Sequence, residues 1–397
     1  MPNLDRRQFV SAGAGLLAAC AGRPAPRERT RPNLLFLFPD QWRYDWLGTN
    51  PAVAVRTPNV DALAARGVRF ERAVCASPLC APSRACLAAG VEYDACGVRG
   101  NGEDYPLDKP TYYRMLRDAG YHVLGCGKFD LHKATEDWGL DGKRLLDEWG
   151  FSGGIDNAGK FDAIRSGATE PRDPYMAYLH AQGLAETHIA DFAKRRGLES
   201  FSNTEPTPLP DPAYCDNWIA ERGLELLREA PADRPWHLQV NFTGPHDPLD
   251  ATAKMLEGWR DVDRFPEANR NTQFPAAKHR EMRQNYSAMC TNIDAWVGRF
   301  LEEVERRGEL ENTLVVFSSD HGEMLGDHDR WRKNVPYQPS AGVPFLMRSP
   351  SSLILSGSRM YSRASADTVM TSQAMIRPWP FLRGSRRWLT TLRPACP

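Results

Sequence analysis

Two pairs of side chains that can bind a cation each follow an apolar run of the sequence. Asp40 and Gln41 come after the run that begins at Asn33, and Asp320 and His321 come after a second run. Three oxygen-bearing side chains and one imidazole suit Ca²⁺ or Mg²⁺ better than zinc. A lone aspartate in such a position is more often a helix N-cap, but two pairs favour a metal site.

A cysteine that could act as a nucleophile lies between these pairs. Cys80 opens the segment Cys80-Ala-Pro-Ser-Arg84, which follows a turn-like stretch and precedes a short helical run over residues 85–89. A cysteine at a helix N-terminus sits where the helix dipole favours anions, so its thiol can be a low-pKa nucleophile. The alternative is a buried structural cysteine.

The segments around these residues predict the elements that position them. Apolar runs over residues 33–38, 121–126, 236–242 and 312–318 are typical of strands buried on both faces of a parallel sheet. Residues 60–66 and 278–307 have helical character, and each stretch ends at a glycine. Strands that alternate with helices predict an α/β fold with a mainly parallel central sheet flanked by helices. Ligands collect at the carboxyl ends of such strands, so we expect Asp40 and Asp320 to lie close together.

Composition narrows the class of protein. The 397 residues are 42% hydrophobic, which is enough for a sizeable core. Lys plus Arg and Asp plus Glu number 50 each, so the overall charge favours neither nucleic acid nor a membrane surface as partner. The nine cysteines have neither zinc-finger spacing nor the pattern of a disulfide framework, and most are expected to be small buried side chains.

Residues 1–30 are predicted to be an export signal and tether. Arg6 and Arg7 form a twin-arginine pattern, and the apolar run that follows is too short to span a bilayer. The sequence Leu17-Ala-Ala-Cys20 is typical of a lipoprotein signal, with Cys20 lipidated; ordinary cleavage after a small residue is the alternative. We therefore expect transport by the twin-arginine export machinery to the periplasm, with a possible lipid anchor.

The Cys80 segment and its surroundings resemble type I sulfatases, the formylglycine-dependent branch of the alkaline phosphatase superfamily. The likeness extends over residues 57–64 and 67–70 upstream and 318–323 downstream, in the order typical of the family. It implies the alkaline phosphatase-like fold over residues 31–348. It also implies hydrolysis of sulfate esters, carbohydrate sulfates above all, at a formylglycine that a formylglycine-generating enzyme makes from Cys80.

The resemblance also assigns roles to individual residues. It implies that Asp40, Gln41, Asp320 and His321 hold the Ca²⁺ or Mg²⁺ ion, with modified Cys80 as a further ligand. It implies that Arg84 orients the formylglycine, that Lys128 and Lys333 bind the sulfate, and that His246 protonates the leaving group.

Two positions depart from the family pattern. Gln41 stands where a second aspartate is usual, which removes one negative charge from the cation site. Asp130 stands where a histidine is usual, two residues after Lys128, and His132 follows two residues later. Either Asp130 or His132 fills the base position; we favour His132 because a neutral imidazole titrates near working pH.

The resemblance stops after Arg348. Residues 349–397 are rich in arginine and serine, hold a single acidic residue, Asp367, and sustain neither helical nor strand periodicity. Such a composition is typical of a sequence that is read out of frame or truncated, although a basic binding tail is an alternative. We expect the family's C-terminal subdomain to be missing or replaced.

Two other functions stay open, a formylglycine-dependent phosphonate monoester or phosphodiester hydrolase and an inactive remnant. Substrate choice is expected to lie in the loops of residues 136–207.

Overall fold

The structure, a computed structural model, describes residues 31–197, 200–270, 272–350 and 370–371. The chain divides into two units, residues 1–32 and 33–397, and everything below concerns the second. Across the described ranges, no helix is long and apolar enough to cross a bilayer. The export signal at residues 1–30 lies outside the described residues, as does most of the tail.

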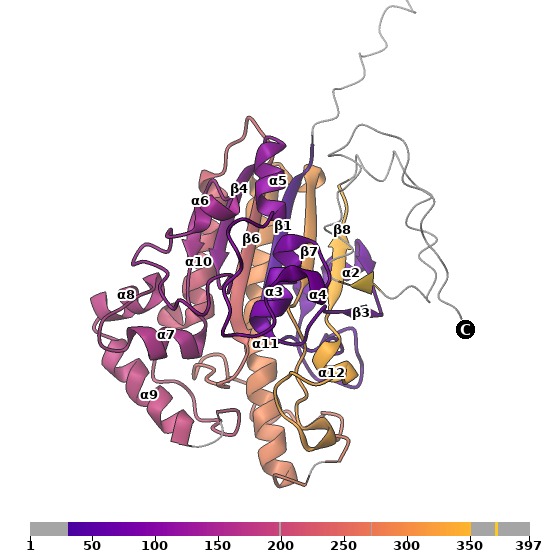
Figure 1. Ribbon diagram of the computed structural model, residues 1–397. Coiled ribbons are helices and arrows are strands. Elements are labelled where there is room, and N and C mark those ends of the chain that lie inside the picture. The colour runs from indigo at the N-terminus through magenta and orange to yellow at the C-terminus, as the bar shows by residue number, and fades with distance from the viewer. Residues whose placement is uncertain (1–30, 198–199, 271, 351–369, 372–397) are drawn as a thin grey trace, which may run out of the picture. The chain divides into compact units, whose positions relative to one another are not determined.

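A seven-stranded sheet forms the centre of the protein (Figure 1). Strand β8 runs antiparallel to both of its neighbours, and the other neighbouring pairs are parallel. The four predicted strands are β1, β4, β6 and β7, and the predicted α/β class with a mainly parallel sheet is confirmed. In spatial order the strands are β2 (Val68–Arg69), β8 (Phe345–Arg348), β7 (Thr313–Ser318), β1 (Asn33–Asp40), β6 (Trp236–Pro245), β4 (His122–Gly127) and β5 (Gly153–Asp156).

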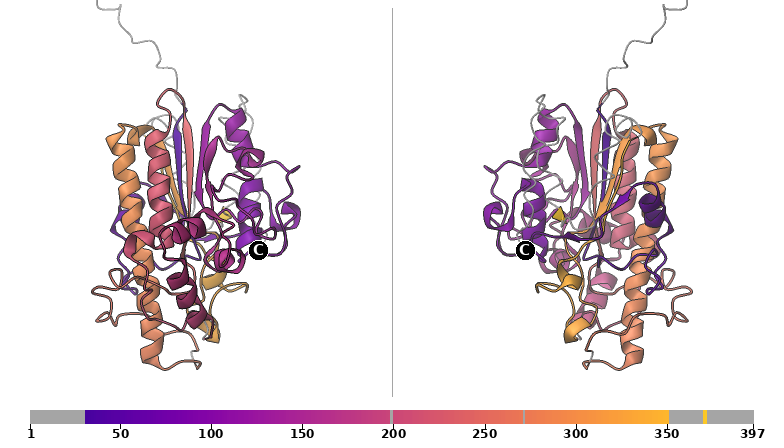
Figure 2. Two further views of the ribbon diagram at one scale, coloured as in Figure 1. Left: turned by 90° about the vertical axis from the view of Figure 1, so that its left-hand side faces the viewer. Right: turned by 90° about the vertical axis from the view of Figure 1, so that its right-hand side faces the viewer.

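Helices cover both faces of the sheet because its strands are apolar on both sides (Figure 2). In β1, Leu35 and Leu37 belong to the cluster packed by α10 and α11, whereas Phe36 and Phe38 belong to a cluster with Leu87 of α3. One face carries α2 (Pro58–Ala65), α10 (Cys215–Glu229) and α11 (Ala276–Arg306), and the other carries α3 (Cys80–Ala89) and α5 (Tyr112–Asp118).

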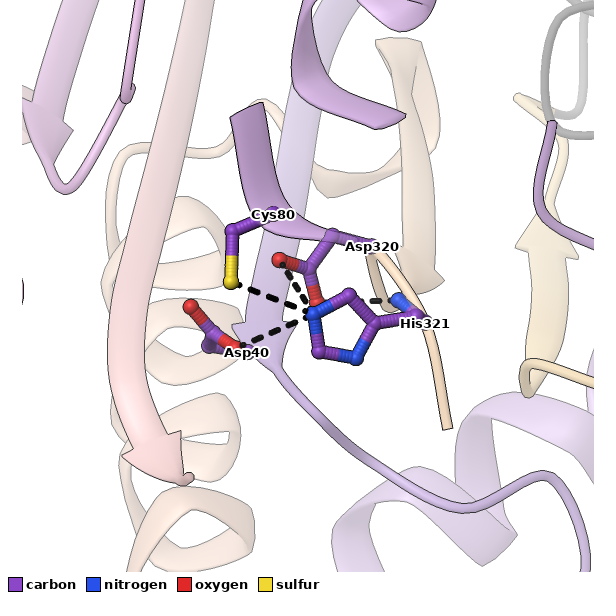
Figure 3. A group of neighbouring side chains, drawn as sticks. All are labelled: Asp40, Cys80, Asp320 and His321. Atoms are coloured by element: carbon purple, nitrogen blue, oxygen red, sulfur yellow. Dashed lines mark hydrogen bonds and ion pairs between the residues drawn. The ribbon is translucent and has the colours of Figure 1, made fainter. Parts of the chain in front are cut away.

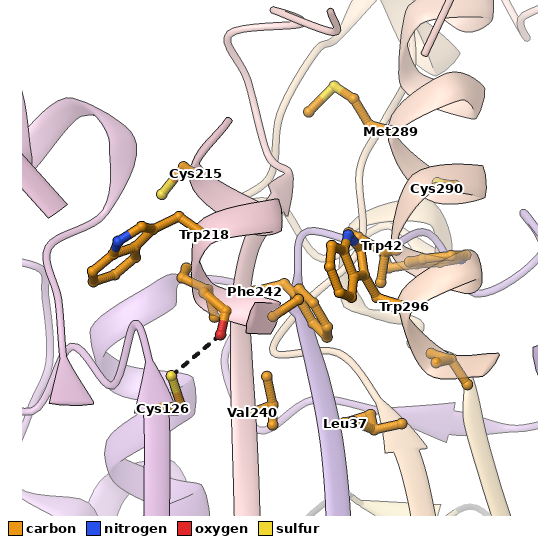
Figure 4. Packing of buried hydrophobic residues seen from close by; sticks show 14 of the residues in the cluster. Leu37, Trp42, Cys126, Cys215, Trp218, Val240, Phe242, Met289, Cys290 and Trp296 are labelled. Atoms are coloured by element: carbon orange, nitrogen blue, oxygen red, sulfur yellow. Dashed lines mark hydrogen bonds between the residues drawn. The ribbon is translucent and has the colours of Figure 1, made fainter. Parts of the chain in front are cut away.

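Aromatic and sulfur-containing side chains fill the core under α10 and α11 (Figure 4). Phe242 of β6 is in one buried cluster with Trp218 of α10 and Trp296 of α11. Cys126 donates its thiol hydrogen to the carbonyl oxygen of Ile219 at 3.4 Å. Every cysteine in the described ranges after residue 32 is buried and free, as expected.

The segment expected to hold specificity loops is largely helical. Residues 136–207 contain α6 (Leu146–Trp149), β5, α7 (Lys160–Gly167), α8 (Pro174–Ala181) and α9 (Ala185–Gly197). The other short elements are β3 (Ala73–Val74), α4 (Tyr93–Cys96), η1 (Asp211–Ala213), η2 (Leu310–Asn312), η3 (Asp327–Asp329) and α12 (Gln338–Ala341).

One fragment of the tail is described. Strand β9 (Met370–Thr371) pairs in parallel with β3 in a two-stranded sheet. Two residues of the predicted aberrant tail thus have a defined partner in the body of the protein. The expectation that residues 349–397 do not form a subdomain otherwise concerns residues outside those the structure describes.

Candidate active site

The two predicted ligand pairs meet because their strands are neighbours. Strands β1 and β7 are parallel and in register from Asn33 with Thr313 onward. Asp40 is the last residue of β1, and Asp320 and His321 follow the end of β7. Cys80 is the first residue of α3, and ligand-type atoms of these four buried residues lie within 4.8 Å of one another (Figure 3).

The two aspartates are held by hydrogen bonds that leave one oxygen without a partner. Asp320 Oδ1 accepts from the backbone N–H groups of Gln41 and His321, both at 2.9 Å. Arg84 donates from Nε to Asp320 Oδ2 at 3.0 Å and from Nη2 to Asp40 Oδ2 at 3.2 Å. Asp40 Oδ1 is buried, has no hydrogen-bond donor in the described part of the chain, and lies 3.7 Å from His321 Nε2.

Two neighbours of opposite kind fix the orientation of the Gln41 amide. Gln41 Nε2 donates to Glu323 Oε2, and Gln41 Oε1 accepts from Lys333 Nζ. A flipped amide would set two donors against each other at Lys333 and two acceptors at Glu323. The side-chain amide oxygen of Gln41 therefore points toward Lys333, and the Gln41 backbone lies in the left-handed region at φ 67°.

Cys80 has a cationic environment. Its Sγ lies 3.3 Å from His321 Nε2. Burial raises the pKa of the thiol and Asp40 adds to this, but Lys128, Lys333 and His321 together bring the pKa well below its ordinary value. The position favours a negatively charged atom at the N-terminus of α3.

Lysine and histidine side chains line a cavity of about 1060 Å³ that opens above Cys80. Lys128 contacts Asp40 Oδ2, and burial lowers the pKa of this lysine while Asp130 and Asp40 raise it well above its usual value. Lys333 Nζ contacts His246 Nε2. We use "the cavity" below for this space.

His246 has a defined tautomer in this arrangement. Its Nδ1 lies 2.6 Å from the carbonyl oxygen of Asp247, while its Nε2 faces the Lys333 ammonium. A carbonyl oxygen only accepts and an ammonium only donates, so the proton is on Nδ1 and the lone pair on Nε2. The Nε2 atom is thereby directed to the cavity side.

Comparison with known proteins agrees with this geometry. The sulfatase family model matches residues 32–354. The chain belongs to the sulfatase family. An arylsulfatase of Clostridium perfringens is 29% identical over 345 residues, covering 82% of this chain and 70% of the relative. An ulvan-active sulfatase of Formosa agariphila is 30% identical over 327 residues, covering 81% of this chain and 57% of the relative.

Solved structures establish the fold of this sulfatase. A phosphonate monoester hydrolase of Agrobacterium radiobacter matches with a TM-score of 0.62 and 24% identity, covering 81% of this chain and 68% of that one. A putative sulfatase of Bacteroides fragilis matches with a TM-score of 0.60 and 21% identity, covering 83% and 70%. The protein has an α/β fold of the alkaline phosphatase-like type, and the family to which it belongs acts on sulfate esters.

The structure does not bring His132, our favoured base, to the cavity of this sulfatase. Its ring packs against Trp149 at 5.1 Å between centroids and against Trp138 at 5.4 Å. Neither ring nitrogen finds a hydrogen-bond partner in the described ranges, and burial lowers the pKa of His132 to about 4. The chain turns at Asp130, whose φ of 54° is left-handed, and this sends the next residues in another direction.

Lys133 was missed by the sequence interpretation and lines the cavity instead. Its Nζ donates to Asp130 Oδ2 at 2.9 Å and also to Asp162, while Asp130 Oδ2 lies 3.2 Å from Lys128 Nζ. Asp130 thus joins two buried ammonium groups. The only signal in the sequence was a lysine three residues after an aspartate, which is common on surfaces.

Proposed function

We propose that this sulfatase hydrolyses sulfate esters of carbohydrates with a formylglycine made from Cys80 and a divalent cation. The observation that carries the proposal is the position of Cys80, buried at the start of α3 among Asp40, Asp320 and His321 and facing the cavity. A nucleophile there meets a cation site on one side and ammonium groups on the other. A buried structural cysteine needs neither.

The donor atoms fit a hard divalent cation. Asp40 Oδ1 is buried and no described residue donates a hydrogen bond to it, as expected of an oxygen that binds a metal. Asp40, Gln41, Asp320 and His321 would hold the ion together with modified Cys80, and the oxygen-rich set suits Ca²⁺ or Mg²⁺. When bound, the ion supplies positive charge for the attacking and sulfate oxygens.

Side chains of the protein bind the sulfate ester and supply the proton that the leaving oxygen takes up. Lys128 and Lys333 offer ammonium groups to the sulfate oxygens, and in the described part of the chain the hydrogen-bond partners of Lys333 are two neutral side chains, Gln41 and His246. Its charge is therefore available to an anion. His246 Nε2 shares a proton with the Lys333 ammonium at the cavity wall, and this pair gives one proton to the leaving oxygen, while the backbone carbonyl oxygen of Asp247 accepts from Nδ1–H.

Mass spectrometry of the Cys80 peptide tests this function. Coexpression with a formylglycine-generating enzyme should give the mass change from cysteine to formylglycine, together with turnover of a simple aryl sulfate. Cys80→Ala should abolish turnover. Cys86→Ala, on the same helix and equally buried, should retain it. Folded protein that keeps an unmodified thiol at position 80 and still hydrolyses the ester would contradict the proposal.

A second candidate is a phosphonate monoester or phosphodiester hydrolase at the same site. Lys133 adds a further ammonium group to the cavity wall, beside Lys128, and phosphoryl groups share the tetrahedral geometry of sulfate. Relative kcat/KM values on matched sulfate, phosphate and phosphonate esters separate the two activities.

A further inference from the structure

The cavity is much larger than one tetrahedral anion needs. Pockets of about 300–1000 Å³ enclose most of a drug-sized ligand, and this one reaches about 1060 Å³. Lys128, Lys333 and His246 occupy the end near Cys80, while α7, the end of α9 and residues 200, 247 and 332 build other parts of the wall. The space accommodates sugar residues beyond the reacting ester.

Arg332 is a rigid cation on this wall. Its Nε donates to Asp247 Oδ2 at 3.1 Å and its Nη2 donates to Ser200 Oγ at 2.6 Å. The guanidinium lies over the Phe201 ring at 5.5 Å from the centroid, yet 47% of the side chain is exposed. A φ of 68° at Arg332 lets it line the same cavity as Lys333, its neighbour in sequence. The guanidinium is thus preorganised, with surface left for a ligand.

Arg196 supplies a second guanidinium from the last turn of α9. It is exposed, lines the cavity, and makes no ion pair or side-chain hydrogen bond to the described residues. Two other basic side chains on the wall, in contrast, form ion pairs: Lys160 with Asp250 at 2.6 Å, and Arg165 with Asp162 at 2.7 Å. Among the residues that the structure describes, Arg196 therefore adds positive charge that no carboxylate balances.

We propose that the cavity takes a substrate with a second anionic group, a sulfate ester or a carboxylate, which Arg332 and Arg196 bind while the first sulfate lies at Cys80. The proposal rests on the sulfatase function above. Guanidinium groups suit both anions because they donate two parallel hydrogen bonds to a pair of oxygens. A cationic sulfate ester, such as choline sulfate, would be a poor substrate.

Binding to Cys80→Ala protein tests the second site without turnover. Three probes are titrated by calorimetry: N-acetylglucosamine 6-sulfate, glucosamine 2-N,6-O-disulfate, and a disaccharide of glucuronic acid with 6-sulfated N-acetylglucosamine. We expect at least one probe with two anions to bind about tenfold or more tighter than the single sulfate, as for charge-assisted hydrogen bonds. Which one does so tells sulfate from carboxylate.

Arginine variants then assign the preference. Arg196→Gln and Arg332→Gln should each reduce the ratio of the affinities for double and single anions, and the pair should bring it near one. Arg144→Gln, an exposed arginine outside the cavity wall, should leave the ratio unchanged. Arg196 has no hydrogen-bond or ion-pair partner in the described part of the chain, so its variant separates an effect on binding from one on folding.

The experimental outcomes distinguish the proposed second anion site from the proposed sulfatase function. Equal or absent binding of all probes, or a ratio that survives both substitutions, overturns the second site. Mature enzyme that hydrolyses no sulfate ester, yet keeps an arginine-dependent preference for two anions, overturns the proposed function and leaves the second site standing.

Discussion

Exchanging Glu323 for glutamine should weaken Ca²⁺ binding although Glu323 is not one of the proposed ligands. Glu323 is buried; its Oε1 accepts from the backbone N–H groups of Leu325 and Arg332, and its Oε2 accepts from Gln41 Nε2. In Glu323→Gln, the new amide keeps the two backbone bonds with its oxygen and turns its NH₂ toward Gln41. Two donors then face each other.

The magnitude follows from one misplaced hydrogen bond. Gln41 relieves the clash by flipping, which turns its NH₂ toward Lys333 and the cation site. Binding the ion then requires the amide to turn back, at a cost of about 1–3 kcal/mol for an unsatisfied buried group. This corresponds to a loss of roughly 5- to 150-fold in Ca²⁺ affinity. Calorimetric titration of metal-free protein measures it directly.

A swapped pair distinguishes orientation from simple loss of charge. In the double variant Glu323→Gln with Gln41→Glu, the hydrogen bond is reversed: the amide at 323 donates to the carboxylate at 41, so a donor again faces an acceptor and the total charge equals that of the wild type. Affinity should recover. Glu281→Gln, which removes a partly exposed carboxylate on α11, should have no effect. Wild-type affinity in the single variant, or no recovery in the swapped pair, would refute the reasoning.

Three further predictions concern other parts of the chain. Burial lowers the pKa of His237 to about 4. The stabilisation by neutral His237 is therefore complete above the unfolded pKa of about 6.5, and about 3 kcal/mol of it is lost as the pH falls toward 4. Chemical denaturation should show a smaller difference in the free energy of unfolding between pH 7 and pH 5 for His237→Gln than for the wild type. Protein with an unmodified Cys80 presents a thiolate beside two carboxylates and an imidazole, so metal analysis should find Zn²⁺ preferred over Ca²⁺, with the preference reversed after conversion to formylglycine. Cys20→Ser should move the exported protein from the membrane fraction to the soluble periplasm, and unchanged fractionation would reject the lipid anchor.

Sequence reasoning located the strands that carry the site because those strands are long and apolar. β1 and β7 are both buried on two faces, and their pairing puts Asp40 beside Asp320. The interpretation missed β2, β5 and β8, which are two to four residues long. Elements of that length have no period to read, and tertiary contacts define them.

The expected and observed positions of His132 and Lys133 differ because of one backbone turn, at Asp130. The left-handed conformation at Asp130 directs Lys133 to the cavity and buries His132 between two tryptophans. Aspartate is one of the non-glycine residues that adopt this conformation most often, but the sequence does not show which of its aspartates does so. The pairing of Glu323 with Gln41, 282 positions apart in the chain, likewise needs the folded structure.

The carboxylate of Glu323 connects the proposed cation site with the proposed second anion site. One of its oxygens holds the amide of Gln41 and the other holds the backbone of Arg332. The same buried carboxylate therefore supports Gln41 at the proposed cation site and Arg332, which we propose binds the second anionic group. If a ligand at one of these sites shifts Glu323, the two sites are coupled, and linkage makes that coupling reciprocal. We expect the cation to tighten binding of a doubly anionic saccharide by the factor with which the saccharide tightens binding of the cation.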